Sequence, residues 1–108
     1  MKIARKKARC QLIDSEALAD AAECLRSIAH PIRLRILELL LQGEYSVGEL
    51  AEQCDALQHV VSEHLGVMRD RGLLERERRG RCTYYKVVKP GVAGIIECIR
   101  ASFGSRAR

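Results

Sequence analysis

Several polar side chains between residues 58 and 69 recur at spacings that place them on one face of a helix, with the reach to touch the edges of nucleic-acid bases. Gln58 can pair with adenine, Glu63 can accept from cytosine, and Ser62 can donate or accept. Gly66 leaves out a side chain where a backbone could crowd a duplex. An ordinary solvated helix face is the alternative explanation of this pattern. The candidate DNA-reading residues of this stretch are Gln58, His59, Ser62, Glu63, His64 and Arg69.

A cluster of arginines follows at the tip of a predicted β-hairpin. Residues 74–79 and 81–88 alternate as two strands would, and Arg79-Gly80 provides the turn between them. The tip therefore carries Arg78, Arg79 and Arg81, which we expect to contact phosphates. This basic tip favours the DNA-reading interpretation of residues 58–69 over the solvated face.

Two short helices must position these side chains. Ser46 followed by Glu49 is a capping box, which predicts a helix from Val47 to about Cys54. A second helix is indicated by an apolar stripe at i, i+4 and i+7, closed by a glycine; its residues are Val61, Leu65, Met68 and Gly72. Two helices joined by a tight turn and followed by a basic hairpin predict a winged helix-turn-helix, mainly α with one small β-hairpin.

The remaining segments complete one domain. Asp14 or Ser15 can cap a first helix, and His30-Pro31 breaks it and starts a second, central core helix over residues 32–41, with His30 as a cap or turn residue. Pro90 opens a last helix with one apolar side. We therefore expect a basic arm over residues 1–13, a winged helix domain over 14–104 and a tail over 105–108.

These segments together resemble the arsenic-repressor (ArsR/SmtB) family of bacterial transcriptional regulators, over about residues 18–103. The resemblance implies a homodimeric repressor that dimerises through its first and last helices and leaves its operator when an inducer, often a metal or metalloid ion, binds. Because the helix from Gln58 in each protomer would read one major groove, we expect the operator to be an inverted repeat. The residues that carry the resemblance are the run 29–37, the run 48–51, the run 61–65, the run 69–74, Gly80-Arg81 and Tyr84-Tyr85.

One turn departs from the family. It reads Cys54-Asp55-Ala56-Leu57, where members have a glycine and then a serine or threonine cap. Asp55 could form its own cap with Gln58 and move the start of the second helix of the motif by about one or two residues.

Charge along the chain is polarised. The sequence has a net charge of +5, and residues 1–10 alone carry five bases and no acid. Residues 11–55 hold nine acids against three bases, whereas residues 69–81 hold six bases against three acids. This distribution favours an anionic partner at the hairpin end and at the arm, although the arm could equally be a solubilising leader.

The five cysteines do not form a spaced disulfide framework, and no stretch is apolar enough for a signal peptide or a membrane helix. We therefore expect a cytoplasmic protein with no membrane partner.

Thiols are the remaining candidates for sensing an inducer. The Cys-x-Cys metal signature of the family is missing because Ser46 and Gly48 stand in its place, and the last helix lacks the histidines of the family's other metal site. A thiophilic metal or metalloid ion, or an oxidant or reactive sulfur species, would then bind or modify thiols. The candidate residues are Cys24, Cys98, Cys10 and Cys54, and the alternative is that they are small apolar packing residues.

Catalysis is disfavoured by the motifs. The sequence has no glycine-rich phosphate loop or nucleophile elbow. Ser62, Glu63 and His64 are neighbours on a helix and point about 100° apart, so they cannot converge as a triad. A Cys54–His59 nucleophile pair is the remaining enzymatic possibility, and a winged helix used only for protein contacts is the other alternative function.

Overall fold

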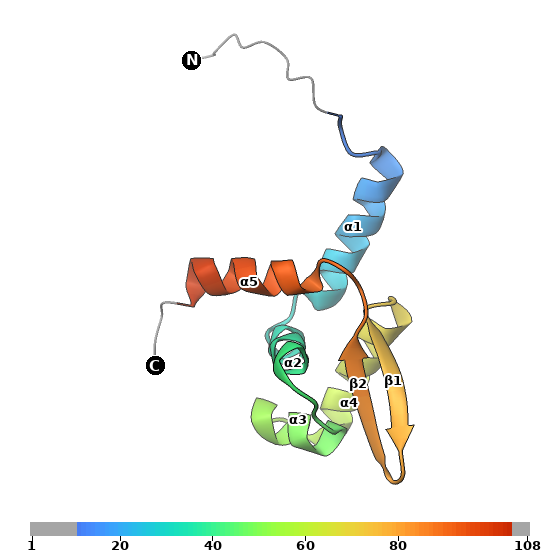
Figure 1. Ribbon diagram of the computed structural model, residues 1–108, viewed down its shortest axis with the longest axis vertical. Helices are drawn as coiled ribbons and strands as arrows, with labels where there is room; N and C mark the ends of the chain where they lie inside the picture. Colours follow the sequence, from blue (N-terminus) through green and yellow to red (C-terminus); the bar gives the residue numbers. More distant parts are fainter. Residues whose placement is uncertain (1–10, 105–108) are drawn as a thin grey trace.

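The structure, a computed structural model, describes residues 11–104 of the 108-residue chain. Residues 1–10 of the expected basic arm, Cys10 among them, and the tail at 105–108 lie outside the described residues. The elements are α1 (Ser15–Ile28), α2 (Pro31–Gln42), α3 (Val47–Cys54), α4 (Gln58–Asp70), β1 (Leu74–Arg79), β2 (Cys82–Val87) and α5 (Val92–Phe103). Their order and arrangement confirm the predicted winged helix-turn-helix (Figure 1).

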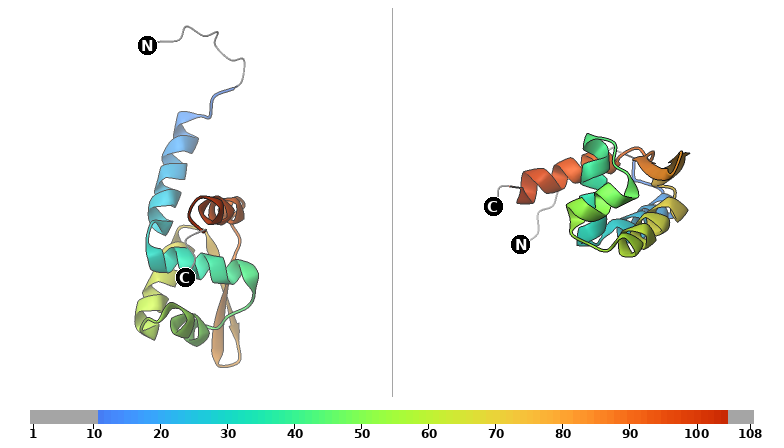
Figure 2. Two further views of the ribbon diagram at one scale, coloured as in Figure 1. Left: turned by 90° about the vertical axis from the view of Figure 1, so that its left-hand side faces the viewer. Right: turned by 90° about the horizontal axis from the view of Figure 1, so that it is seen from below.

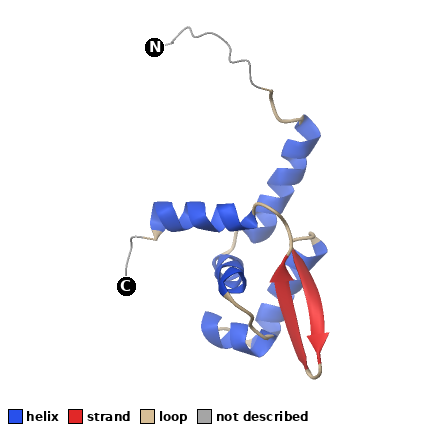
Figure 3. Cartoon of the chain, viewed as in Figure 1, coloured by secondary structure: helices blue, strands red, loops and turns tan. Residues whose placement is uncertain are grey.

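The core lies between α2 and the helix-turn-helix pair α3–α4. Ile36 and Leu37 of α2 are fully buried, as are Leu50 of α3 and Leu65 of α4. Because α2 contributes to this core from the middle of the domain, it is the central helix that its apolar sequence predicted. The hairpin packs beside the helices as the only sheet among the described residues (Figure 3).

Side-chain caps define three of the helix starts. The predicted capping box of α3 is confirmed: Ser46 Oγ accepts from the Glu49 amide at 3.2 Å, and Glu49 Oε1 accepts from the Ser46 amide at 2.8 Å. Asp14 caps α1, and His30 caps α2 by accepting from the Ile32 amide at 3.1 Å. Asp14 is thus the cap of α1 among the two predicted candidates, Asp14 and Ser15, and the predicted role of His30 as a cap is confirmed.

The prediction that Asp55 caps α4 was wrong. Asp55 ends α3 instead, in a left-handed conformation with φ of 53°, and α4 begins after Leu57 without a side-chain cap. Helix α4 therefore still starts at Gln58. Two element bounds differ slightly from the prediction. The hairpin turn is Gly80-Arg81 and not Arg79-Gly80, so β2 starts at Cys82. Helix α5 starts at Val92, two residues after Pro90.

The two faces of the hairpin carry different side chains. Leu74 pairs with Val87 and Arg79 with Cys82, so the register is continuous from one end of the hairpin to the other. Alternation along β1 places Arg76 and Arg78 on the face that also carries buried Leu74, and Arg79 on the opposite face. An isolated bridge between Ser46 and Tyr84 holds β2 against the start of α3.

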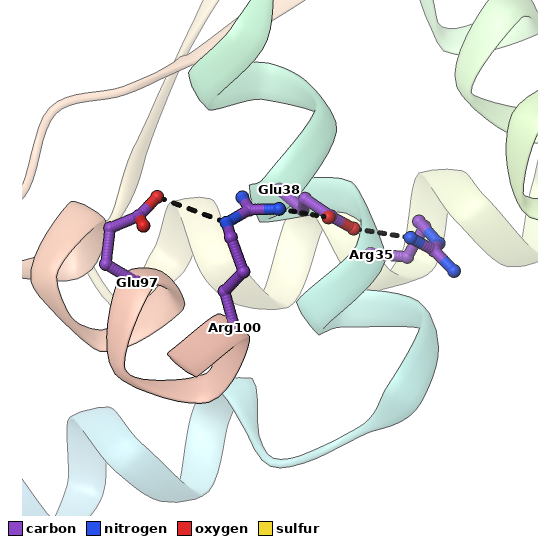
Figure 4. A network of polar contacts seen from close by, with 4 residues as sticks. All are labelled: Arg35, Glu38, Glu97 and Arg100. Carbon is purple, nitrogen blue, oxygen red and sulfur yellow. Dashed lines mark hydrogen bonds and ion pairs between the residues drawn. The ribbon is translucent and has the colours of Figure 1, made fainter. Parts of the chain in front are cut away.

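Helices α1 and α5 extend beyond the core in different directions (Figures 1 and 2). Glu38 of α2 accepts from Arg100 of α5 at 3.3 Å and also pairs with Arg35, while Glu97 pairs with Arg100, so a chain of ion pairs joins α5 to the central helix (Figure 4). Large apolar side chains nevertheless stay exposed on both helices; they are Leu18, Leu25 and Phe103. No helix in residues 11–104 is both long and apolar enough to cross a bilayer.

Candidate nucleic-acid interface

An open groove of about 580 Å³ lies between the start of α3, the outer face of α4 and the hairpin. We call it the basic groove. Its lining residues are Ser46, Val47, Gly48, Gln58, Ser62, Gly66, Arg69, Arg76, Arg81, Cys82, Thr83 and Tyr85.

The α4 side of the basic groove is a single helical stripe. Gln58, Ser62, Gly66 and Arg69 follow one another at steps of four, four and three residues, which keeps them on one face. The neighbouring stripe of the same helix, Val61, Leu65 and Met68, lies about 90° further around and is buried in the core. Burial of that stripe therefore fixes the rotation of α4 and aims Gln58 and Ser62 into the groove.

Glycines leave room on both sides of Gln58 and Ser62. A Cβ on Gly48 would lie 3.7 Å from Gln58 Oε1, an ordinary van der Waals contact, so the glycine keeps this side of the amide free of side-chain atoms. A Cβ on Gly66 would meet no protein atom within 4 Å, which leaves that part of the groove open to a ligand. The amide and the hydroxyl are thus presented at the groove surface, where they can donate and accept hydrogen bonds.

The charge of the groove is positive. Arg69 projects from α4, Arg76 from β1 and Arg81 from the hairpin turn, and no carboxylate among the described residues lines it. Three guanidinium groups around polar side chains match a polyanion whose bases are read between two phosphate backbones. Residues 58, 62, 69 and 81 of the predicted site are thereby brought together.

Arg76 was missed by the sequence reasoning. It lies two residues before Arg78, so strand alternation puts both on the same face of the hairpin. The period of two along the predicted strand is therefore the sequence signal for Arg76, which lies outside the hairpin tip.

The other two predicted hairpin arginines are placed differently. Arg79 lies on the opposite face, where it donates to Glu44 at 3.1 and 2.9 Å and to Glu77 at 3.2 Å, and its Cζ sits 4.4 Å from the Tyr84 ring centroid. These hydrogen bonds lower the pKa of the Glu44 carboxyl, so the pair stays charged. Arg78 is exposed and donates to the Gly80 carbonyl at 3.2 Å. Arg79 therefore holds the hairpin against the α2–α3 connection rather than entering the groove.

Three predicted residues of α4 lie outside the groove lining. His59 and Glu63 are exposed on α4 beside the stripe that lines the groove. His64 is half-buried on the far side of the helix, where it contacts Arg33 and His30. We therefore do not place His64 among the base-contacting residues, because it is two residues from Ser62 and so about 200° around the helix.

The described cysteines lie in four different environments. Cys24 is half-buried and packs against the core from α1, and Cys98 is exposed on α5. Cys54 is half-buried, and burial raises the pKa of its thiol, which lowers its thiolate fraction. Cys82 is exposed in the basic groove. Within residues 11–104 of one protomer, no three histidine, cysteine or acidic side chains are grouped so as to hold a metal ion.

Comparison with known proteins agrees with this geometry. Residues 30–76 match the sequence profile of bacterial regulatory proteins of the arsR family. The biofilm growth-associated repressor of Agrobacterium fabrum is 37% identical over 84 residues, which cover 78% of this chain and 72% of the repressor. The chain belongs to the arsR family. Like other arsR-family members it is a DNA-binding transcriptional regulator and not an enzyme.

Solved arsR-family structures share the fold. HlyU from Vibrio cholerae superimposes with a TM-score of 0.78 at 30% identity, covering 84% of this chain and 99% of HlyU, and HlyU has also been solved in a reduced form. The homodimeric winged helix-turn-helix domain of Mb0332 from Mycobacterium bovis superimposes with a TM-score of 0.72 at 27% identity, covering 84% of each chain.

Proposed function

We propose that the protein is a homodimeric repressor that binds an inverted-repeat operator, with the recognition helix α4 of each protomer in one major groove. The observation that carries the proposal is the basic groove, in which Gln58 and Ser62 lie among three guanidinium groups without a carboxylate. The amide and hydroxyl would read bases, and Arg69, Arg76 and Arg81 would fix the helix on the phosphates. Repression is supported by the Agrobacterium relative, which is a repressor, whereas HlyU of Vibrio cholerae is a transcriptional activator.

Dimerisation is proposed through α1 and α5. Leu18 and Leu25 on α1 are 51% and 50% exposed, and Phe103 on α5 is 63% exposed, so each helix presents large apolar side chains that one protomer does not cover. A homodimeric relative with the same fold supports a second copy as the cover. Two protomers would then present two recognition helices to one operator, as an inverted repeat requires.

The operator can be found by selecting bound duplexes from a random pool. Alanine at Gln58 or at Ser62 should then weaken binding to the selected operator by about 1–3 kcal/mol each and relax the preference at particular base pairs. The measurement is fluorescence anisotropy against the selected operator and its single-base variants. The matched control is Gln53→Ala, an exposed residue of α3 outside the basic groove.

Equal losses of affinity for the Gln58→Ala and Gln53→Ala proteins would count against base reading by α4. Unchanged base preference in both the Gln58→Ala and Ser62→Ala proteins would do so as well. Failure of the selection to enrich any sequence would favour a winged helix used only for protein contacts.

We further propose that thiols sense the inducer in the reducing cytoplasm, the compartment of bacterial DNA. Cys98 is exposed on α5 and Cys24 lies half-buried on α1, so both belong to the helices that we expect to form the dimer interface. A soft metal or metalloid ion held between such thiols, with Cys10 as a possible third ligand, would change how the two recognition helices are spaced. Cys54 is a weaker candidate because its burial disfavours the thiolate.

Oxidation or reactive sulfur is the second candidate signal, supported by HlyU, a relative that has been solved in a reduced form. Arsenite, cadmium, lead, zinc and polysulfide can be compared on the purified operator complex. The effective inducer should weaken operator binding by about 5- to 150-fold.

The Cys24→Ser and Cys98→Ser proteins, made separately, should bind the operator normally without that inducer and stay bound with it. Cys82→Ser controls for the loss of a thiol away from α1 and α5: whatever its affinity without inducer, which can change because Cys82 lines the basic groove, the inducer should weaken its binding by the same factor as in the wild-type protein. Normal release of the Cys24→Ser, Cys98→Ser double variant would eliminate this pair.

A further inference from the structure

A cluster of three side chains lies behind the recognition helix, on the side away from the basic groove. Arg33 of α2 donates from Nε to His64 Nδ1 of α4 at 2.9 Å. The His64 ring packs on the ring of His30, with centroids 4.5 Å apart and planes tilted by 47°. We call His30, Arg33 and His64 the histidine cluster.

The cluster joins three helices. A second nitrogen of Arg33, Nη1, donates to the Ser27 carbonyl at 2.8 Å, in the last turn of α1. Ser27 is buried, with 5% of its surface exposed. His30 is the N-cap of α2. Arg33 therefore connects the end of α1 and the start of α2 to the middle of α4, where Ser62 lies two residues before His64.

The hydrogen bonds require both rings to be neutral. His64 accepts through Nδ1 from a guanidinium, and His30 accepts through Nδ1 from the Ile32 amide, so the ring proton of each must be on Nε2. A proton added to His64 Nδ1 would remove the acceptor from Arg33. It would also place an imidazolium against a guanidinium, so a bond that holds α4 would become a repulsion.

The surrounding charges oppose protonation of His64. Burial lowers the pKa of this imidazole most, the adjacent His30 ring and the Arg33 guanidinium lower it further, and Glu63 on α4 raises it. On α1 the charged residues Glu23 and Arg26 pair with each other, and Glu23 also pairs with Arg71 just after α4. Because the native ring has the lower pKa, the unfolded chain binds more protons just below about pH 6.5, so the free energy of unfolding falls as pH drops through that value.

We propose that the histidine cluster is a proton-sensitive support that positions α4 for DNA reading and lets it shift when His64 is protonated. His64 is a positioning residue, since it faces away from the groove and acts through Arg33. The buried stripe of Val61, Leu65 and Met68 keeps α4 in the fold, so the change is a displacement of the helix rather than unfolding. Acidification then weakens specific DNA binding, although it adds positive charge to the protein. The effect on DNA rests on the proposed function, whereas the helix shift does not.

The helix shift is tested without DNA. In an NMR titration of the labelled full chain from pH 8 to pH 5, the His64 ring should titrate at a pKa below about 6.5, and the backbone amides of residues 58–70 should shift with the same midpoint. In the His64→Gln protein, whose amide oxygen can still accept from Arg33 and does not titrate, those amide shifts should be absent. Amides of α4 that stay unchanged in the wild-type protein while His64 titrates would overturn the proposal, even if His64→Gln did not fold.

The DNA effect is tested by anisotropy on the selected operator between pH 8 and pH 5.5 at constant ionic strength. Wild-type affinity should fall by about tenfold, the loss expected for one hydrogen bond to a charged group, and His64→Gln affinity should vary much less. His59→Gln removes the exposed histidine of the same helix and should keep the wild-type fall whatever its affinity at pH 8. A His64→Gln protein that keeps the full fall would overturn the proposal. Absence of operator binding at every pH would contradict the proposed function instead and leave the NMR result to decide the cluster.

Discussion

Replacing both Arg76 and Arg81 by alanine is expected to remove most of the affinity for duplex DNA and to flatten its dependence on salt. Both side chains line the basic groove, where no carboxylate of the described residues competes for them. A dimer would lose four phosphate contacts, so the negative slope of log affinity against log salt should become about 3–4 units less steep. The measurement is anisotropy of a random duplex at several salt concentrations, since phosphate contacts act on every sequence.

The control for this variant removes the same charge from the same hairpin region. Lys86 lies on β2 beside Glu77 and Tyr84, away from the basic groove, and Lys89 follows the end of β2. The Lys86→Ala, Lys89→Ala protein should keep a slope close to that of the wild type. Equal slopes in the two double variants would mean that net charge, and not the groove, determines DNA binding.

The helices that form the basic groove were predicted from patterns of residues that are close in the sequence. The capping box of Ser46 and Glu49 and the stripe of Val61, Leu65 and Met68 depend on residues three to seven positions apart, so they were visible in the sequence. The start of α4 at Gln58 was also correct, although its proposed Asp55 cap was not. The tight turn between α3 and α4 was predicted too, whereas the left-handed conformation that Asp55 adopts in this turn was not.

Pairings between distant segments were the part that the sequence did not reveal. Arg79 donates hydrogen bonds to Glu44, which lies 35 residues earlier in the chain, and His64 accepts one from Arg33, 31 residues earlier. Such contacts depend on how the hairpin packs on the α2–α3 connection and how α4 packs on α2. Of the predicted site residues, Arg79 and His64 have such a distant partner, and neither lines the basic groove.

Leu65→Ala is expected to lower the free energy of unfolding by about 2–5 kcal/mol, because it leaves a cavity where α4 packs in the core. Leu65 is fully buried, whereas Val67 on the same helix is 37% exposed, so Val67→Ala is a matched control that should change stability by less than about 0.5 kcal/mol. Urea unfolding at one protomer concentration measures both, because dimerisation makes stability depend on concentration. A Leu65→Ala cost no larger than that of Val67→Ala would contradict the rotation of α4 that aims Ser62 into the groove.

The most direct test of the central claim is hydroxyl-radical footprinting of the wild-type protein on the operator selected from random duplexes. Two recognition helices in one dimer should protect two inverted half-sites centred about one helical turn apart. Each protected half-site should lose its protection in the Arg76→Ala, Arg81→Ala protein. Protection of a single site without an inverted partner, or no protection of any selected sequence, would contradict a dimeric repressor that reads DNA with Gln58 and Ser62.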